Sequence, residues 1–438
     1  MIETSGAPWF VAQTQEIDPI DDPLLFADPA SPLAWLRRGD GIVGVGGMVA
    51  GFEAGAGAGT PFGRPEPTDR PTPAEAWRDI VARSEIDDPL GIPGTGLVAF
   101  GALAFDPRST STSRLMVPRA IVGRRDGRAW ITRIRNTRTD PVDDTPFPVS
   151  RPYGPYWSAT LGPGAMNPVA YQEAVRAALA AIDAGTVEKV VLARDLVGTV
   201  PAGADLRRLV RALAGSYPDT WAFAVDGLVG ASPETLVTVS RGRMTARVLA
   251  GTAARGADAA TDARAVAALA ASTKDLEEHR FAVQSVLTAV DPFTQEVDAG
   301  AGPFTLELPN VWHLATDISG AVRGSASALD LVAALHPTAA VAGTPTDAAV
   351  DLIRRLEPFD RGRYAGPVGW VDGNGDGEWA IALRCAQIGS EPARRFAEYS
   401  DTMPVTAHAG AGIVAGSDPE TEMLETRVKF RPIVDALA

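Results

Sequence analysis

The segment YAGPVGWVDGNGDGEWAIALRCAQI (364–388) decides the fold class, because it has the pattern of strands joined by a tight turn. Apolar residues flank the Gly- and Asp-rich turn DGNGDG (372–377), a composition typical of a hairpin connection. The segment LVTVSRGRMTARVLAG (236–251) repeats this pattern, and two short strands meet across Asp126-Gly127. Hairpin-connected strands form antiparallel sheets, so we expect an α+β protein and not a doubly wound parallel sheet.

Helices are predicted where capping residues precede an apolar stripe. Asn167 before Pro168 is a typical start, because Asn caps the first turn and Pro fits it without needing its missing N–H. A second helix is predicted over 273–290, because Ser272 with Asp275 gives a capping-box-like start. The last helix is predicted to begin at Ser417, with Glu420 completing a capping box.

Two stretches rich in Gly and Pro, 51–74 and 136–165, are predicted to be long surface loops. The second loop separates a β-rich N-terminal part, 1–150, from a C-terminal part that mixes strands and helices.

The composition argues against several classes of function. With 54 acidic and 40 basic residues the net charge is −14, which disfavours binding to nucleic acid or to an anionic membrane. There is no signal-peptide pattern and no run of about 18 apolar residues, so we expect a cytoplasmic protein without a membrane span. The single cysteine, Cys385, fits a reducing compartment. Only four His are present, so a bound metal would be a hard cation held by carboxylates.

Two acidic pairs of the same spacing are the most informative candidates for chemistry. Asp275 and Glu278 lie three apart on one predicted helix, and Glu422 and Glu425 lie three apart on another. This spacing puts both side chains of a pair on one helical face, and two facing pairs would suit Mg²⁺. Lys429 follows on the face of the second pair. The alternatives are solvated charges near a helix N-terminus and an ordinary i,i+4 ion pair.

Nine segments, read in order, resemble the chorismate-utilising enzymes, a family that includes anthranilate, aminodeoxychorismate, isochorismate and salicylate synthases. The matching segments are KVVLARD (189–195), GASPETLV (230–237), LAGTAARG (249–256), KDLEEH (274–279), VWHLATDISG (311–320), LHPTAAVAGTP (335–345), EPFDRGRYAGPVGW (357–370), GEWAIALRCAQI (377–388) and GAGIVAGSDPETEMLETRVK (410–429). They cover most of 166–438, whereas residues 1–150 match only loosely. The resemblance implies one domain over 1–438, with two large antiparallel sheets packed together and surrounded by helices.

The resemblance also assigns the acidic pairs to a magnesium site. It implies that Glu278 and Glu425 bind Mg²⁺ directly and that Asp275 and Glu422 support them, partly through water. Many family members carry Glu where this chain has Asp275, and the shorter side chain favours an indirect role there.

Two positions, 189 and 250, discriminate among the reactions of the family, and Glu234 completes the expected acid–base pair. Aminodeoxychorismate synthases carry a nucleophilic Lys where this chain has Ala250, so covalent amine chemistry is not expected. Members that add water at C2 of chorismate use as base a Lys that matches Lys189. A lysine acts as a base only if its pKa is lowered toward working pH. Glu234 resembles the acid that protonates the departing C4 hydroxyl. Taken alone, a strand Lys is normally solvent-facing and a Glu after Pro is normally a turn residue.

The resemblance further implies a set of substrate contacts. Tyr364 and Arg384 are expected at the enolpyruvyl carboxylate, which the planar guanidinium fork of Arg384 suits. The remaining expected contacts are the backbone amides around Gly410 and Gly412 at the same group, Gly251 and Thr252 near the ring carboxylate, Lys429 near the metal, and His336 as a positioning residue.

These assignments predict an isochorismate synthase, an isomerase that transfers a hydroxyl group within chorismate and needs no glutaminase subunit. We expect it to act as a monomer. The alternatives left open are salicylate synthase, which eliminates pyruvate afterwards, and anthranilate synthase component I. A catalytically silent homologue would be expected to lack Lys189, Glu234 or a metal-binding Glu, and all are present. The motifs leave open whether the product serves menaquinone or siderophore biosynthesis.

Overall fold

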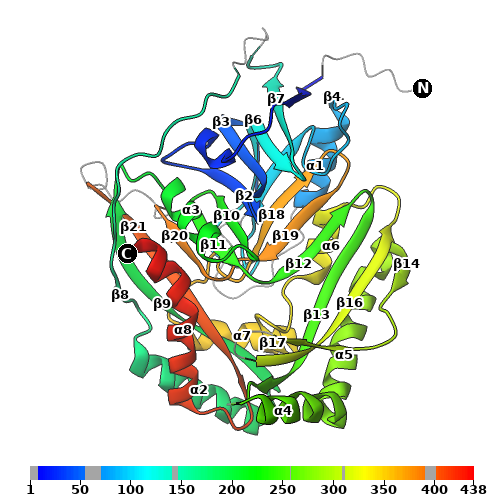
Figure 1. Cartoon of the computed structure of the whole chain (residues 1–438). Helices are drawn as coiled ribbons and strands as arrows, with labels where there is room; N and C mark the ends of the chain where they lie inside the picture. The colour runs from blue at the N-terminus through cyan, green and yellow to red at the C-terminus, as the bar shows by residue number, and fades with distance from the viewer. Residues whose placement is uncertain (1–7, 55–70, 141–146, 257, 308–310, 390–400) are drawn as a thin grey trace. The chain divides into compact units, whose positions relative to one another are not determined.

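The computed structural model describes residues 8–54, 71–140, 147–256, 258–307, 311–389 and 401–438 (Figure 1). Within these ranges the chain forms eight α-helices and 21 strands, and nearly all strand pairs are antiparallel. The predicted α+β class with antiparallel sheets is therefore confirmed. No helix among the described residues is both long and apolar enough to cross a membrane.

The chain divides into two compact units. Unit 1 comprises Met1–Glu234, His336–Gly373 and Ala380–Ala438, and unit 2 comprises Thr235–Leu335 and Asn374–Trp379. This division into units does not test the prediction of one domain over 1–438, which stays a prediction.

Unit 1 is built on a long succession of paired strands. Its strands are β1 (Phe10–Ile17), β2 (Leu33–Arg37), β3 (Asp40–Ala54), β4 (Ser84–Asp87), β5 (Val98–Ala102), β6 (Ser113–Arg125), β7 (Arg128–Asn136), β8 (Leu161–Pro163), β9 (Lys189–Pro201), β10 (Trp221–Val225), β11 (Leu228–Ser232), β17 (Gly343–Thr344), β18 (Pro367–Asp372), β20 (Cys385–Ile388) and β21 (Thr402–Val414). The pairing order is β4-β1-β7-β6-β3-β2-β10-β11-β20-β21-β9, in which only β1–β4 is parallel. Strand β5 joins β6 to β18, and β9 also pairs with β8 and β17.

The helices of unit 1 are α1 (Pro73–Ala82), α2 (Pro168–Asp183), α3 (Arg207–Ser216), α7 (Thr346–Leu356) and α8 (Pro419–Leu437). Helix α8, drawn in red in Figure 1, packs against β21. Its buried Phe430, Ile433 and Leu437 join a core cluster with Ala407 and Ala409 of β21. This apolar contact holds the carboxylates of the first turns of α8 beside β21.

Unit 2 contains β12 (Thr235–Ser240), β13 (Arg243–Ala254), β14 (Thr294–Asp298), β15 (Phe304–Glu307) and β16 (Val311–Val322), with α4 (Ala259–Ala271), α5 (Thr273–Val290) and α6 (Ala328–Leu335). Strand β16 pairs with β13, β14 and β15, and α5 packs on β13. Strand β19 (Gly377–Ile381) has residues in both units.

The predicted turns form as expected because their φ requirements are local. Asp126 and Gly127 both have positive φ, at 51° and 79°, and connect β6 to β7. Arg241 and Gly242 do the same between β12 and β13. Two positive φ values suit the twist of a tight hairpin.

The segment 364–388 differs from the prediction, because it forms three strands and not two. After β18 and β19 the backbone breaks at Arg384, whose φ is +49°, and β20 then pairs with β11 and β21. After the break, β20 pairs with β11 and β21. The sequence pattern that predicted a hairpin gave no sign of this third strand.

Two of the three predicted helix starts are confirmed. The side chain of Asn167 caps α2, and Ser272 caps α5 by accepting from the amide of Asp275. The start of α8 is different: Asp418 is the N-cap and accepts from the amide of Thr421. Asp is as good an N-cap as Ser, and it directly precedes the Pro at the first helical position.

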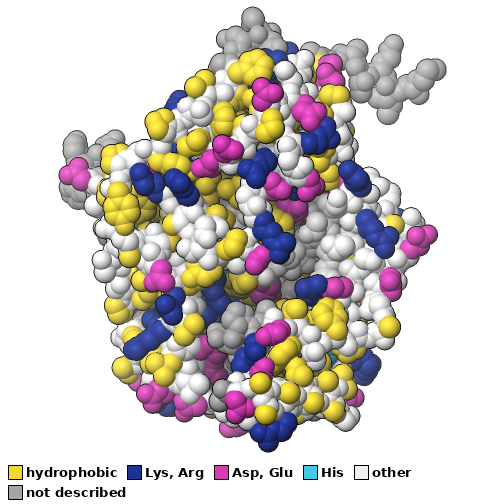
Figure 2. Space-filling view, in the orientation of Figure 1, with side chains coloured by type: hydrophobic (Ala, Val, Ile, Leu, Met, Phe, Trp, Pro, Cys, Tyr) yellow, Lys and Arg dark blue, Asp and Glu magenta, His cyan; other side chains and the backbone are white. Residues whose placement is uncertain are grey.

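The face of the molecule drawn in Figure 2 carries Lys and Arg side chains interspersed with Asp and Glu. No large basic patch is visible on this face.

Candidate active site

Lys189 begins β9 and lies against a glycine of the neighbouring strand. A Cβ atom added to Gly412 of β21 would lie 3.0 Å from Cε of Lys189. On the other side of β9, a Cβ atom on Gly343 of β17 would lie 2.1 Å from the carbonyl oxygen of Lys189. Both glycines therefore permit close approach at Lys189, one to its side chain and the other to its backbone.

Glu234 follows β11 and lies among three positively charged groups. Its amide donates to the hydroxyl of Ser232 at 3.2 Å. Burial raises the pKa of the Glu234 carboxyl above its ordinary value, and the charges of Lys189, Arg384 and Lys429 oppose this rise without cancelling it. Burial disfavours the carboxylate form, so Glu234 holds a proton more readily than an exposed Glu. The fold thus places Lys189 and Glu234 within electrostatic reach of each other.

Tyr364 and Arg384 are also brought together. Tyr364 is buried, with 6% of its surface exposed, and burial raises the pKa of its phenol. Burial lowers the pKa of the Arg384 guanidinium, while Tyr364, Glu234 and Glu425 act in the opposite direction. Arg384 therefore lies close to three of the other predicted site residues from unit 1.

The acidic pair of α8 lies on one face, as its spacing predicts. Glu425 forms an ion pair with Lys429 at 2.5 Å, and Lys429 Nζ also donates to the carbonyl oxygen of Gly410 at 2.8 Å. Glu422 accepts from the hydroxyl of Ser417 at 2.7 Å. Burial raises the pKa of Glu422, Ser417 opposes the rise, and the charge of Glu425 adds to it. A divalent cation beside Glu422 would favour its charged form, which burial and the charge of Glu425 disfavour.

The other acidic pair lies on α5 in unit 2, beside a bulge of β13. The register of β13 against β16 shifts between Ala250 and Thr252, and Gly251 has a φ of +79°. A Cβ atom on Gly251 would lie 3.2 Å from Cβ of Asp275, so the bulge and the start of α5 are in contact. Asp275 is half-buried and Glu278 is exposed.

The bulge and α5 are also joined by hydrogen bonds. The ring of His279, next to Glu278, bonds the carbonyl oxygen of Ala250 at 3.0 Å and the hydroxyl of Thr316 at 2.7 Å. Because a carbonyl only accepts, Nδ1 carries the proton. The backbone of Thr252 lies opposite His313, and its side chain is outside the described ones.

The two acidic pairs thus belong to different units, and each has a well-defined local setting. In the described part of the chain, no three His, Cys, Asp or Glu side chains are grouped closely enough to hold a metal ion. A magnesium site built from both pairs stays a prediction.

His336 lies in a setting that fixes its tautomer. Its Nε2 lies 2.9 Å from the carbonyl oxygen of Phe105, so Nε2 carries the proton and donates. Nδ1 is buried and has no hydrogen-bond partner among the described residues. Burial lowers the pKa of His336 to about 4. The ring therefore offers a neutral nitrogen acceptor.

His408 is a residue that the sequence analysis missed. Its ring stacks on Tyr364 with centroids 5.1 Å apart and contacts Phe359 at 4.8 Å. Burial lowers the pKa of His408 to about 4. The period of two along a strand puts 408 on the same face as Gly410 and Gly412, and this signal was available in the sequence.

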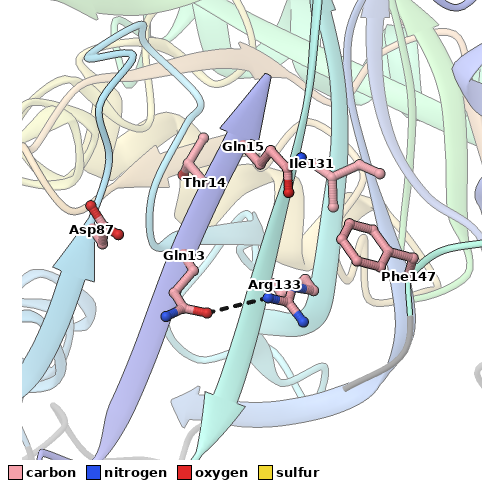
Figure 3. A pocket seen from close by; sticks show the side chains of 7 residues that line it. All are labelled: Gln13, Thr14, Gln15, Asp87, Ile131, Arg133 and Phe147. Atoms are coloured by element: carbon pink, nitrogen blue, oxygen red, sulfur yellow. Dashed lines mark hydrogen bonds between the residues drawn. The ribbon is translucent and has the colours of Figure 1, made fainter. Parts of the chain in front are cut away.

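A surface hollow lies elsewhere in unit 1, on β1, β4 and β7 (Figure 3). It is lined by Gln13, Thr14, Gln15, Asp87, Ile131, Arg133 and Phe147. Gln13 and Arg133 are joined by a long hydrogen bond of 3.4 Å across it. None of the predicted site residues lines this hollow, so it supports no assignment.

This chain is similar in sequence and in fold to a family of enzymes. The sequence profile of the family described as chorismate binding enzyme matches residues 157–438. A Mycobacterium tuberculosis protein named putative isochorismate synthase MenF is 39% identical over 359 residues, covering 78% of this chain and 87% of that protein. Isochorismate synthase EntC of Escherichia coli K12 is 33% identical over 344 residues, covering 77% and 80%.

Solved structures agree with the sequence comparisons. The structure of MenF, the menaquinone-specific isochorismate synthase from Escherichia coli, matches with a TM-score of 0.74 at 25% identity and covers 99% of this chain and 95% of its own. Anthranilate synthase component I from Streptococcus pneumoniae shares the fold, with a TM-score of 0.64, 19% identity and coverage of 99% and 94%. This chain belongs to the chorismate-binding enzyme family.

The settings of the histidines make a prediction for titration. His336 and His408 should stay neutral from about pH 5.5 to 8, because burial disfavours the charged ring. Their ¹⁵N chemical shifts can be followed by NMR, with His336→Gln and His408→Gln for assignment. A midpoint near the ordinary value of about 6.5 for either ring would contradict the burial described above.

Proposed function

We propose that this chain is an isochorismate synthase, which converts chorismate to isochorismate reversibly. The observation that carries the proposal is that Lys189 lies within electrostatic reach of Glu234, whose pKa burial raises against the charges of three cations. Addition of water and loss of a hydroxyl together require a base and an acid, and a raised pKa makes Glu234 a better proton donor than an exposed Glu. The names of the relatives support the same reaction.

The proposed chemistry balances without an outside acid or base. Lys189, in its neutral form, takes a proton from water while the water oxygen bonds to C2 of chorismate. Glu234 gives its proton to the C4 hydroxyl, which leaves as water. The product then faces a protonated Lys189 and an ionised Glu234, which exchange roles in the reverse direction. No ammonia enters, so we propose a monomer that works without a glutaminase subunit.

The proposed substrate contacts fall into two sets, one at the enolpyruvyl carboxylate and one near the ring carboxylate and the metal. Arg384 and Tyr364 lie close together and offer a guanidinium and a phenol to the enolpyruvyl carboxylate. The other proposed contacts are the amides around Gly410 and Gly412 at that group, Gly251 and Thr252 near the ring carboxylate, Lys429 near the metal, and His336 through its unbonded Nδ1.

We also propose that Mg²⁺ is the cofactor. Glu278 and Glu425 would bind it directly, with Asp275 and Glu422 in support, since hard oxygen donors suit this ion. When bound, the cation would hold the ring carboxylate and stabilise the negative charge that develops on it. The raised pKa of Glu422 supports a cation next to α8.

Two alternatives differ in how the reaction ends or in its nucleophile. A salicylate synthase would form isochorismate with the same residues and then eliminate pyruvate. An anthranilate synthase would use ammonia, and the likeness to its component I extends to the fold only. The acid and base described above favour water. We place the enzyme in the cytoplasm, where its one thiol, the buried Cys385, would stay reduced.

Removing the acid or the base separates chemistry from binding. Lys189→Ala should abolish turnover of chorismate while binding, measured by calorimetry, survives. Glu234→Gln keeps the shape of the side chain but has no proton to give, so kcat should fall about 10²–10⁴-fold. Arg241→Gln, in the turn between β12 and β13, is the control and should retain activity. Loss of binding in Lys189→Ala would make Lys189 a substrate-holding residue and would contradict its role as base.

Removing one carboxylate tests the metal assignment. Glu425→Gln and Glu278→Gln should each raise the Mg²⁺ concentration needed for half-maximal turnover by about tenfold or more, because each removes a charged oxygen ligand. Glu420→Gln is the control, since Glu420 is exposed in the first turn of the same helix as Glu425. An unchanged Mg²⁺ dependence in both variants would remove these residues from the metal site.

A further inference from the structure

Strand β9, which carries Lys189, has one edge that strands cover only in part. Along the other edge, β21 pairs with β9 over its whole length. On the first edge, β17 pairs with Lys189 and Val190, and β8 pairs with residues 196–198. Among the described strands, none pairs with residues 191–195 on this edge. The backbone groups there need other partners, because an unsatisfied buried N–H or C=O costs about 1–3 kcal/mol.

The carbonyl oxygen of Ala342 accepts from the amide of Val191, and the amide of Gly164 donates to the carbonyl oxygen of Asp195. Two buried side chains supply partners between these points. Arg361 Nη2 donates to the carbonyl oxygen of Val191 at 2.7 Å, and Glu357 Oε1 accepts from the amide of Ala193 at 2.8 Å. Arg361 and Glu357 bind each other through two hydrogen bonds of 2.6 and 2.8 Å. Their side chains are 3% and 0% exposed. This pair, here called the β9 brace, bonds the backbone of β9 at Val191 and Ala193, where no described strand pairs with this edge.

The β9 brace also contacts predicted substrate-binding residues. The guanidinium of Arg361 lies 5.9 Å from the ring centre of Tyr364 and 4.6 Å from that of Phe105. Phe105 in turn accepts the hydrogen bond of His336 and meets its ring edge-on at 5.8 Å. The brace thus touches the strand of Lys189, the ring of Tyr364 and the residue that anchors His336.

Stability alone does not account for a buried ion pair in this place. Taking two charges out of water is costly, and replacing such a pair by apolar side chains of similar volume is often neutral or stabilising. What an apolar pair lacks is directed hydrogen bonding to Val191 and Ala193, the residues that follow Lys189 on the same strand. A shift of about 1 Å in a reacting group can lower the rate about 10²-fold.

We propose that Glu357 and Arg361 are positioning residues, which fix β9 and Tyr364 so that the Lys189 amine and the substrate meet in the reactive geometry. This inference rests on the proposed function. Neither residue touches the substrate in this account, and both act through the groups that they hold.

The test compares two buried ion pairs of unit 1. The brace variant is Glu357→Leu/Arg361→Met. The control variant is Asp205→Leu/Arg207→Met, which removes a pair that is equally buried, at 4% and 1% exposed, and that holds the loop at Gly154 and Pro152. Both are assayed with chorismate and Mg²⁺ well below their melting temperatures, and amide hydrogen exchange is followed over 189–195.

In the brace variant, kcat should fall on the order of 10²-fold, KM should rise, and exchange over 189–195 should accelerate. In the control variant, kcat should stay within about threefold of the unaltered enzyme and exchange over 189–195 should be unchanged, because the hydrogen bonds of that pair go to residues outside 189–195. A second variant, Glu357→Gln, keeps an acceptor for Ala193 and removes the charge. It should fold even if the double variant does not, and lose less kcat.

Equal losses of kcat in the brace and control variants would overturn the inference, as would full kcat in a folded brace variant. The inference would also be overturned if Glu357→Gln kept full kcat while the double variant failed to fold. The pair would then have a structural role only. If the unaltered enzyme does not convert chorismate at all, the proposed function fails. Unchanged exchange over 189–195 in the brace variant would then separately contradict the bracing of β9.

Discussion

The antiparallel ladder between β9 and β21 is the constraint on which the arrangement of unit 1 residues depends. It runs from Lys189 opposite Val414 to Pro201 opposite Thr402 without a register shift. Because register fixes which side chains share a face, the ladder places Lys189 beside Gly412 and leaves room for its side chain there. Helix α8 packs on the same strand and brings Lys429 to the carbonyl oxygen of Gly410. A slip of one residue would separate all of these groups.

The surroundings of Glu234 shift its pKa away from that of an ordinary exposed Glu. Three cations near a carboxyl group would normally lower its pKa, yet burial outweighs them and the pKa is raised. Burial thereby makes Glu234 a better proton donor near the amine proposed as base. Burial also shifts the pKa values of His336 and His408, in their case downward, so both buried rings stay neutral and add no charge.

The sequence predicted the features that depend on local chemistry. The caps at Asn167 and Ser272 and the turns at Asp126-Gly127 and Arg241-Gly242 need only a few neighbouring residues to be right. The family motifs predicted Lys189 and Glu234, and the fold brings the two together. The chain has only three lysines, at 189, 274 and 429, in a sequence that otherwise uses Arg. That scarcity was a further signal for two of the predicted site residues.

Features that depend on distant partners were missed. The strand break at Arg384 is set by pairing of β20 with β11 and β21, and the role of Glu357 and Arg361 appears only when β9 is seen to lack a strand neighbour. The mutual placement of the two acidic pairs is a tertiary property of the same kind. Residue spacing predicts the face of each pair and carries no information on the distance between them.

The most direct test of the central claim, that this protein interconverts chorismate and isochorismate reversibly, is an approach to equilibrium from both sides. The purified protein with Mg²⁺ is given chorismate in one reaction and isochorismate in another, and the products are separated by chromatography. The account predicts the same final ratio of chorismate to isochorismate from both starting points. Accumulation of salicylate and pyruvate, or no turnover with or without ammonia, would contradict it.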